Sequence, residues 1–233
     1  MKKIIIYDFD GTLTPYPITT FKILEECGFI GGGNNKELQL IVLNKMKEKN
    51  IDIYTAFYET IFEIVENNGY PLTNETLSLG AKELQYNEGI LDYFKMLEDK
   101  NVDNYMVSSS MKCFLENTIV SKYFKKIYAS TLQYKNKNIV GIEYLMNDDK
   151  KIDAIKDIVK DNDYTNVIYI GDGLTDLKAM KHIKDNGGVS IFVGDNIDEI
   201  ENKEDISVIF KRDYSSDSDL YNFIKKHLKN DII

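Results

Sequence analysis

The chain has 233 residues, of which 43% are hydrophobic, and it carries a formal net charge of −9 with a pI near 4.9. This length can bury one good core plus a smaller second domain. The acidic balance argues against nucleic acid or anionic membranes as partners. No run approaches the ~20 apolar residues of a membrane span. The apolar run within MKKIIIYDFD is too short for a signal peptide, and acidic residues follow it at once. We therefore expect a cytoplasmic protein with no membrane partner.

The first predicted element is the strand within IIIYDFDGTLT, where an apolar run ends in two aspartates and a glycine. Alternate side chains of a strand point to opposite faces, so Asp8 and Asp10 share a face and can converge on one ion or one phosphate. Ligands of open α/β sheets bind at such strand ends, and ionised carboxylates are costly to hold together without a compensating cation. The simpler alternative is an Asx turn closed by Gly11.

Only helical patterns follow between residue 16 and about residue 87. Glycine-rich or polar breaks separate the candidates, which are residues 18–26, 36–48, 51–67 and 74–85. Strand and helix patterns alternate again from Gly89 onward. The expected elements are first a helix to Leu97, strands over 105–107 and 126–129, and a hairpin over 131–144 with an Asn/Lys turn. A helix from about 147 to 160, a strand before Gly171 and a helix over 177–183 follow. The last expected elements are strands over 189–193 and 206–210 and a helix over 220–228.

Two segments within this second half carry polar residues that suit phosphate chemistry. The 105–107 strand runs into Ser108, Ser109 and Ser110 ahead of a helical pattern, and hydroxyls and amides at a helix start bind phosphate oxygens well. Lys150 and Lys151 fall at the start of the helix in NDDKKIDAIKDIVK, where cations oppose the helix dipole. One of these lysines can instead neutralise a nucleophilic carboxylate and a phosphate oxygen. The simpler alternatives are an ordinary N-cap for Ser108 and a solvated face for the lysines.

The last polar segment is NVIYIGDGLTDLKAM, in which another apolar run meets a glycine and aspartate cluster. Gly171 and Gly173 allow a tight turn, and the segment delivers Asp172 and Asp176 to the end of a strand. Beside Asp8, these carboxylates would form a cluster suited to a hard divalent cation. Because uncompensated carboxylates repel one another, a bound cation is nearly required.

The four segments occur in the order found in the haloacid dehalogenase-like superfamily, which the chain resembles from Asp8 to Asp176. DFDGT and GDGxxD are the specific matches, and Lys151 is preferred to Lys150 because KIDAI is similar to the family pattern. The resemblance implies an α/β fold, with a Rossmann-like parallel-sheet core and a small all-helical cap domain inserted after the first strand. The expected core comprises residues 1–15 and 88–233, and the expected cap residues 16–87.

The resemblance also implies roles for individual residues. Asp8 would be the nucleophile and Asp10 the general acid and base, while Asp8, Asp172 and the Asp10 backbone carbonyl would hold Mg²⁺, with Mn²⁺ as the alternative. The residues expected to bind phosphoryl oxygens or offset their charge are Gly11, Ser108, Ser109 and Lys151. Asp176 would support the metal's waters or the lysine.

These roles imply a Mg²⁺-dependent phosphatase that hydrolyses a small phosphorylated metabolite through an aspartyl phosphate. We expect it to act as a monomer or small homo-oligomer. One alternative is a phosphotransferase or phosphomutase of the same family, because the motif residues cannot separate these activities. Another is a catalytically silent phosphate- or metal-binding protein, although the catalytic set is complete.

The organic part of the substrate is less well specified. The helical block resembles the cap of phosphoserine phosphatases, which hold the substrate carboxylate with an arginine. Arg212 is the only arginine in this chain and lies outside that block, so phosphoserine is disfavoured. Lysines of the block could bind a substrate carboxylate only as single point charges, which is a weaker interaction. Its aromatic residues, which include Tyr54, Phe57 and Tyr58, are either a pocket lining or, more simply, cap core.

Overall fold

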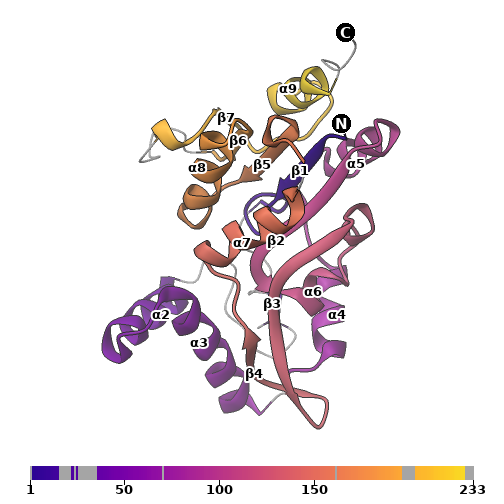
Figure 1. Ribbon diagram of the computed structural model, residues 1–233. Helices are drawn as coiled ribbons and strands as arrows, with labels where there is room; N and C mark the ends of the chain where they lie inside the picture. Colours follow the sequence, from indigo (N-terminus) through magenta and orange to yellow (C-terminus); the bar gives the residue numbers. More distant parts are fainter. Residues whose placement is uncertain are drawn as a thin grey trace.

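The computed structural model describes residues 2–15, 22–23, 25, 36–69, 71–160, 162–195 and 203–228. Within these ranges a seven-stranded sheet has the strand order β4-β3-β2-β1-β5-β6-β7 (Figure 1). All neighbouring strands are parallel except the pair β3 and β4. The strands are β1 (Ile4–Tyr7), β2 (Asp103–Met111), β3 (Lys126–Lys135), β4 (Asn138–Tyr144), β5 (Val167–Gly171), β6 (Val189–Val193) and β7 (Val208–Phe210). The carboxyl ends of the parallel strands therefore share one edge, where ligands of α/β sheets bind.

Strand β1 lies between β2 and β5 and is buried on both faces. Ile5 and Tyr7 pack into one hydrophobic cluster, and Ile4 and Ile6 pack into the other, as the alternation of a strand requires. A continuous run of β-branched apolar residues is typical of such a doubly covered parallel strand. The amide of Asp8 still donates to the Ile170 carbonyl at 2.9 Å, so Asp8 leaves the sheet in a defined position.

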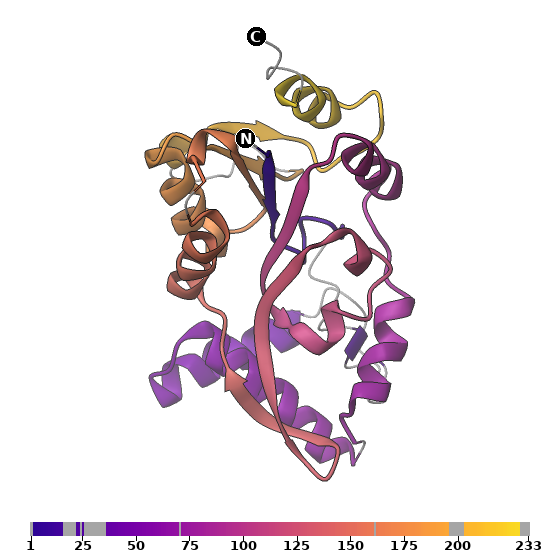
Figure 2. The same ribbon diagram turned by 45° about the vertical axis from the view of Figure 1, so that its right-hand side comes forward.

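Helices cover both faces of this sheet (Figure 2). α7 (Asp148–Val159) and α8 (Leu177–Asp185) bury Ile155 and Met180 in the cluster that contains Ile4 and Ile6. On the other face, α5 (Ile90–Asp99) and α9 (Asp219–His227) bury apolar side chains beside Tyr7, namely Tyr93, Phe94, Leu97, Leu220 and Ile224. The predicted α/β fold with a parallel-sheet core is thus confirmed.

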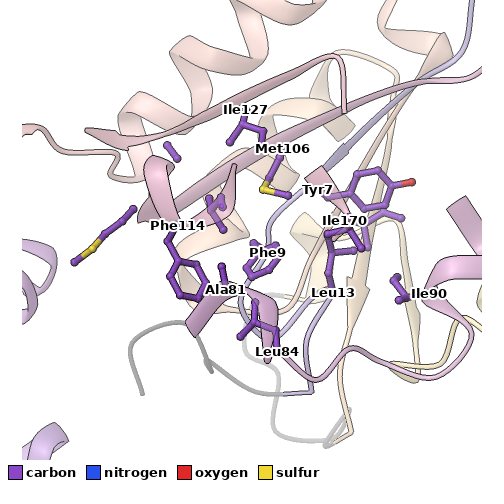
Figure 3. Packing of buried hydrophobic residues seen from close by; sticks show 14 of the residues in the cluster. Tyr7, Phe9, Leu13, Ala81, Leu84, Ile90, Met106, Phe114, Ile127 and Ile170 are labelled. Carbon is purple, nitrogen blue, oxygen red and sulfur yellow. The ribbon is translucent and has the colours of Figure 1, made fainter. Parts of the chain in front are cut away.

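The loop that follows β1 is fixed by hydrophobic packing and by side-chain hydrogen bonds to its backbone. Phe9 and Leu13 point into the hydrophobic cluster beside Tyr7 and Ile170 (Figure 3). The Asn87 side-chain amide donates to the carbonyls of Thr12 and Thr14, at 2.7 and 3.2 Å. The Tyr214 hydroxyl also donates to the Thr12 carbonyl, at 3.0 Å. These contacts fix the backbone that carries Asp10 and its neighbours.

Among the described residues between β1 and α5 lie the helices α2 (Lys36–Lys49), α3 (Ile53–Asn68) and α4 (Asn74–Lys82). Their bounds agree closely with the predicted helices, while most of the helix predicted over 18–26 lies outside the described residues. Asp52 caps α3 and Thr73 caps α4, as their side-chain oxygens accept backbone N–H groups. No helix in the described part of the chain combines the length and the apolar character needed to cross a membrane.

The hairpin of β3 and β4 extends past the ends of the other strands of the sheet, and β4 runs beside α3 (Figure 1). Its turn uses Asn136 and Lys137 at φ 51° and 70°, which agrees with the predicted Asn/Lys turn. The Ile139 amide donates to the Leu72 carbonyl at 2.8 Å, and the Tyr134 hydroxyl donates to Asn74 Oδ1 at 2.7 Å. The insertion is therefore braced by a β-hairpin that is distant in sequence.

The serine segment differs from its predicted structure. Ser108, Ser109 and Ser110 lie within β2, and the helix that follows, α6 (Lys112–Leu115), has only four residues. The pairing of β2 with β3 is irregular between Val107 and Met111, and the Ser130 hydroxyl donates to the Ser109 carbonyl at 2.9 Å. Tertiary hydrogen bonds thus keep the serines extended, and although a helix follows them as expected, its N-cap is Met111 and none of the three serines.

Candidate active site

A cavity of about 300 Å³ opens at the carboxyl edge of the sheet, between the strand ends and α3. Most of the predicted site residues line this cavity. They are Asp8, Asp10, Ser108, Ser109, Lys151 and Asp172. Gly11 and Asp176 lie directly behind this lining, in contact with Asp172 and Lys151 respectively. Segments separated by more than a hundred residues thus meet in one place.

Lys151 joins two carboxylates beneath the cavity. Its Nζ donates to Asp8 Oδ1 at 3.1 Å and to Asp176 Oδ1 at 2.7 Å, and all three side chains are nearly inaccessible to solvent. These two anions offset the unfavourable position of the lysine in the first turn of α7. Lys150 is half-exposed and pairs with Asp153 at 3.5 Å. Lys151 is therefore the lysine that lies at the site.

Asp176 is saturated with hydrogen bonds. Its Oδ1 accepts from Lys151 and from the Tyr169 hydroxyl, at 2.7 and 2.6 Å. Its Oδ2 accepts from the amides of Asp172 and Gly173, both at 3.2 Å. These donors occupy the lone pairs that a carboxylate offers, so Asp176 is suited to holding Lys151 and the β5 turn in place.

The carboxylate of Asp10 also lines the cavity, and the Ser110 hydroxyl donates to its Oδ2. Sequence analysis named Ser110 only as the last of three serines suited to phosphate, and nothing in the sequence connected it to Asp10. The Ser108 hydroxyl accepts the Ser110 amide at 3.3 Å. In contrast, the Ser109 hydroxyl is buried and has no hydrogen-bond partner among the described residues. Ser109 therefore keeps a free donor at the cavity.

Asp172 is held by two residues that sequence analysis also did not assign. Thr12 Oγ1 donates to Asp172 Oδ1 at 3.1 Å, and Arg212 Nη2 lies 3.8 Å from Oδ2. Thr12 belongs to the DFDGT motif, but nothing in the sequence around Arg212 connects it to residues forty positions away. Gly11, at φ +76°, has its amide bound to Thr14 Oγ1, and a Cβ there would come 2.0 Å from Asp172 Oδ2. Only glycine permits this close approach.

The electrostatics of the site favour a bound cation. Burial raises the pKa of Asp8 to about 7, although Lys151 lowers it, and Asp176 and Asp10 raise it further. Burial, with Asp176 and Asp8, also raises the pKa of Asp172 well above its usual range. One carboxylate oxygen from each of Asp8, Asp172 and Asp176 lies within 4.8 Å of the others. Hard oxygen donors that are disfavoured as free anions fit a divalent cation such as Mg²⁺.

Comparison with known proteins agrees with this geometry. The family model described as haloacid dehalogenase-like hydrolase matches residues 5–181. In fold, the chain is similar to a HAD family hydrolase from Salmonella enterica serovar Typhi, with a TM-score of 0.72 and 16% identity over 99% of this chain and 72% of that one. A search by sequence among curated proteins finds no match.

Two further structures of similar fold are phosphoserine phosphatases. One is a substrate-bound complex, with a TM-score of 0.70 and 19% identity over 97% of this chain and 98% of that one. The other holds a phospho-aspartyl intermediate analogue, with a TM-score of 0.67 and 21% identity over the same shares of the two chains. At such low identity these likenesses establish the fold.

Replacing Lys151 tests the buried ion pairs directly. Lys151→Met would leave Asp8 and Asp176 buried without their cation, so we expect the free energy of unfolding to fall by about 3 to 5 kcal/mol. Lys150→Met removes the neighbouring exposed lysine and should change it by less than about 0.5 kcal/mol. Denaturant unfolding in the presence of chelator measures both. Equal effects of the two substitutions would contradict the assignment of Lys151 as the lysine buried between the two carboxylates.

The raised pKa of Asp8 predicts how the metal-free protein responds to pH. Because the folded state binds this proton more tightly than the unfolded state, the stabilisation is complete below the ordinary pKa and is lost as pH rises through about 7. In chelator, the thermal midpoint should fall from about pH 5 to about pH 8 more steeply for the native chain than for Asp8→Asn. Parallel curves for the two proteins would show that Asp8 titrates normally.

Proposed function

The chain belongs to the haloacid dehalogenase-like hydrolases, and we propose that it is a Mg²⁺-dependent phosphatase acting on a small phosphomonoester through an aspartyl-phosphate intermediate. The observation that carries this proposal is the position of Lys151, whose ammonium group bonds to Asp8 at the base of the cavity. A buried cation beside a cavity-lining carboxylate suits a nucleophile that must approach an anionic phosphate.

In the first step, a carboxylate oxygen of Asp8 attacks the phosphorus in line with the ester oxygen. The P–O bond to the organic group breaks, and Asp10 transfers its proton to the leaving oxygen, which departs as an alcohol. The Ser110 hydroxyl, bonded to Asp10 Oδ2, holds this carboxyl group in position. Ser108, Ser109 and Lys151 bind the phosphoryl oxygens, and the unpartnered Ser109 hydroxyl supports this role.

In the second step, Asp10 accepts a proton from a water molecule that attacks the phosphorus of the aspartyl phosphate. Inorganic phosphate leaves, and the Asp8 carboxylate is restored. The same residue serves as acid and then as base because the first step leaves it deprotonated. Asp10 is only partly buried, so water can reach it.

Asp8, Asp172 and the backbone carbonyl of Asp10 would hold the Mg²⁺ ion, which supplies positive charge that screens the nucleophile from the phosphate. Thr12 and Arg212 support Asp172 from the side. Because hydrogen bonds already saturate Asp176, we assign it the role of positioning Lys151.

Residues 16–87 would act as a cap over this centre. Helix α3 lines the cavity, and its tyrosines bond to the other wall: the Tyr54 hydroxyl donates to Asp148, and the Tyr58 hydroxyl donates to the Ser109 carbonyl at 2.7 Å. These contacts support a cap that encloses the organic part of the substrate and excludes water from it.

Loss of the nucleophile should abolish turnover. We expect Asp8→Asn to reduce phosphate release by at least about a thousandfold, while the folded structure persists. The measurement is Mg²⁺-dependent release of phosphate from small phosphomonoesters, with chelator as a second control. Retained turnover in Asp8→Asn would overturn the mechanism. Transfer of the phosphoryl group to an added alcohol or sugar, in place of release as inorganic phosphate, would identify a phosphotransferase.

Metal binding has a readout independent of activity. Mg²⁺ should raise the thermal midpoint of the native protein near neutral pH, because it relieves the repulsion between Asp8 and Asp172. Asp172→Asn should remove most of this increase. Asp195→Asn is the matched control, because Asp195 also lies near Arg212 but is largely exposed. An undiminished increase in Asp172→Asn would exclude Asp172 as a ligand.

A further inference from the structure

We propose that the cavity selects phosphomonoesters whose organic group is an apolar, uncharged hydrocarbon, either aromatic or branched. This inference rests on the proposed function and adds the substrate class to it. The argument comes from the wall that faces the catalytic residues, where the described residues are apolar or aromatic and none carries a charge.

One face of α3 forms most of this wall. Ile53, Phe57 and Ile61 recur every fourth residue and therefore lie along a single stripe of the helix. Ile23 and Met111 add apolar surface from two other segments. Ile61 is buried, whereas 46% of Ile53 is exposed although the side chain is large and apolar. An exposed isoleucine beside a catalytic cavity offers apolar surface that a ligand can cover.

The polar groups of α3 in this wall are already occupied. The Tyr54 hydroxyl donates to Asp148, and the Tyr58 hydroxyl donates to the Ser109 carbonyl. Both tyrosines therefore present their rings to the cavity while their hydroxyls bind the opposite wall. A sugar or another group with several hydroxyls would find few partners here, and its unpaired groups would oppose binding.

Charge in the cavity disfavours a substrate carboxylate. Among the described lining residues Lys151 is the only cation, and it is bound to Asp8 and Asp176. Arg212 is engaged with Asp172, Asp195 and the Pro15 carbonyl. A carboxylate on the organic group would thus be buried against hydrocarbon with no partner, which is costly.

A quaternary ammonium group fits less well than a hydrocarbon. Recognition of such cations uses several aromatic faces around one charge. Here Phe57 and Tyr58 pack edge to face against each other, with centroids 6.3 Å apart and an 88° interplanar angle. The remaining wall is aliphatic, with Ile23, Ile53 and Met111. Burial of apolar ligand surface is therefore the interaction that this wall supplies.

Kinetics on a matched panel test the inference. The panel is phenyl phosphate, 2-methylpropyl phosphate, phosphoserine and phosphocholine, each with Mg²⁺. We expect kcat/KM for the two hydrocarbon esters to exceed that for phosphoserine and phosphocholine by at least about tenfold. Equal or higher values for phosphoserine or phosphocholine would overturn the inference while leaving the proposed phosphatase intact.

Binding provides a test that does not depend on turnover. Calorimetry with Mg²⁺ compares benzylphosphonate with 2-amino-4-phosphonobutanoate, in which a methylene group replaces the ester oxygen of phenyl phosphate and phosphoserine. We expect benzylphosphonate to bind at least about tenfold more tightly. Tighter binding without hydrolysis of any ester would reject the proposed function and retain the ligand class. Weaker or equal binding would overturn the inference.

A charge placed on the wall should reverse the preference. Ile53→Arg puts a guanidinium at a position exposed enough to accept it, and it should shift the ratio of kcat/KM toward phosphoserine by about tenfold. Leu79→Arg is the control, because Leu79 is 49% exposed on α4 and does not line the cavity. An unchanged ratio in Ile53→Arg, or the same shift in Leu79→Arg, would contradict the inference that α3 determines which organic group is accepted.

Discussion

The ammonium group of Lys151, held between the carboxylates of Asp8 and Asp176, is the interaction on which the rest of the site depends. It joins the end of β1, the start of α7 and the turn after β5 where none of the three side chains has appreciable contact with water. Without this cation, two anions would be buried close together, and folding would work against their repulsion and desolvation. A single buried positive charge therefore permits this acidic cluster, at which we propose that a divalent cation and a phosphate bind.

The architecture places the proposed reacting groups and the proposed substrate-selecting wall on different elements. The acidic residues and serines stand on the ends of parallel strands, where a buried sheet holds them rigidly. The apolar wall comes from α3. Strand β4 of the hairpin packs beside this helix, and two tyrosine hydroxyls connect it to the core. Under the proposed function, variation of the helical insertion would change the organic group that is accepted while the reacting groups keep their positions.

Much of this arrangement could be predicted because it depends on local patterns. The apolar run before Asp8 specified a buried strand, and the helical periodicity of α3 and α7 specified their bounds to within two residues. The serine segment was predicted only in part: a short helix does follow it at Lys112, but β2 continues through Ser108 to Met111, and the Ser109 carbonyl accepts hydrogen bonds from Ser130 and Tyr58. Those donors lie more than twenty residues away along the chain, so no local window contains them.

By itself the sequence determined the order of strands and helices, the family, and which carboxylates and lysines end at strand and helix termini, because propensity, periodicity and motif spacing are written along the chain. Only the tertiary structure decided which of two adjacent lysines reaches Asp8, that Ser110 contacts Asp10, and that Arg212 supports Asp172. It also decided that the aromatic face of α3 lines a cavity as well as a core. These outcomes depend on distances between segments far apart in the chain, which follow from packing and leave no trace in local sequence.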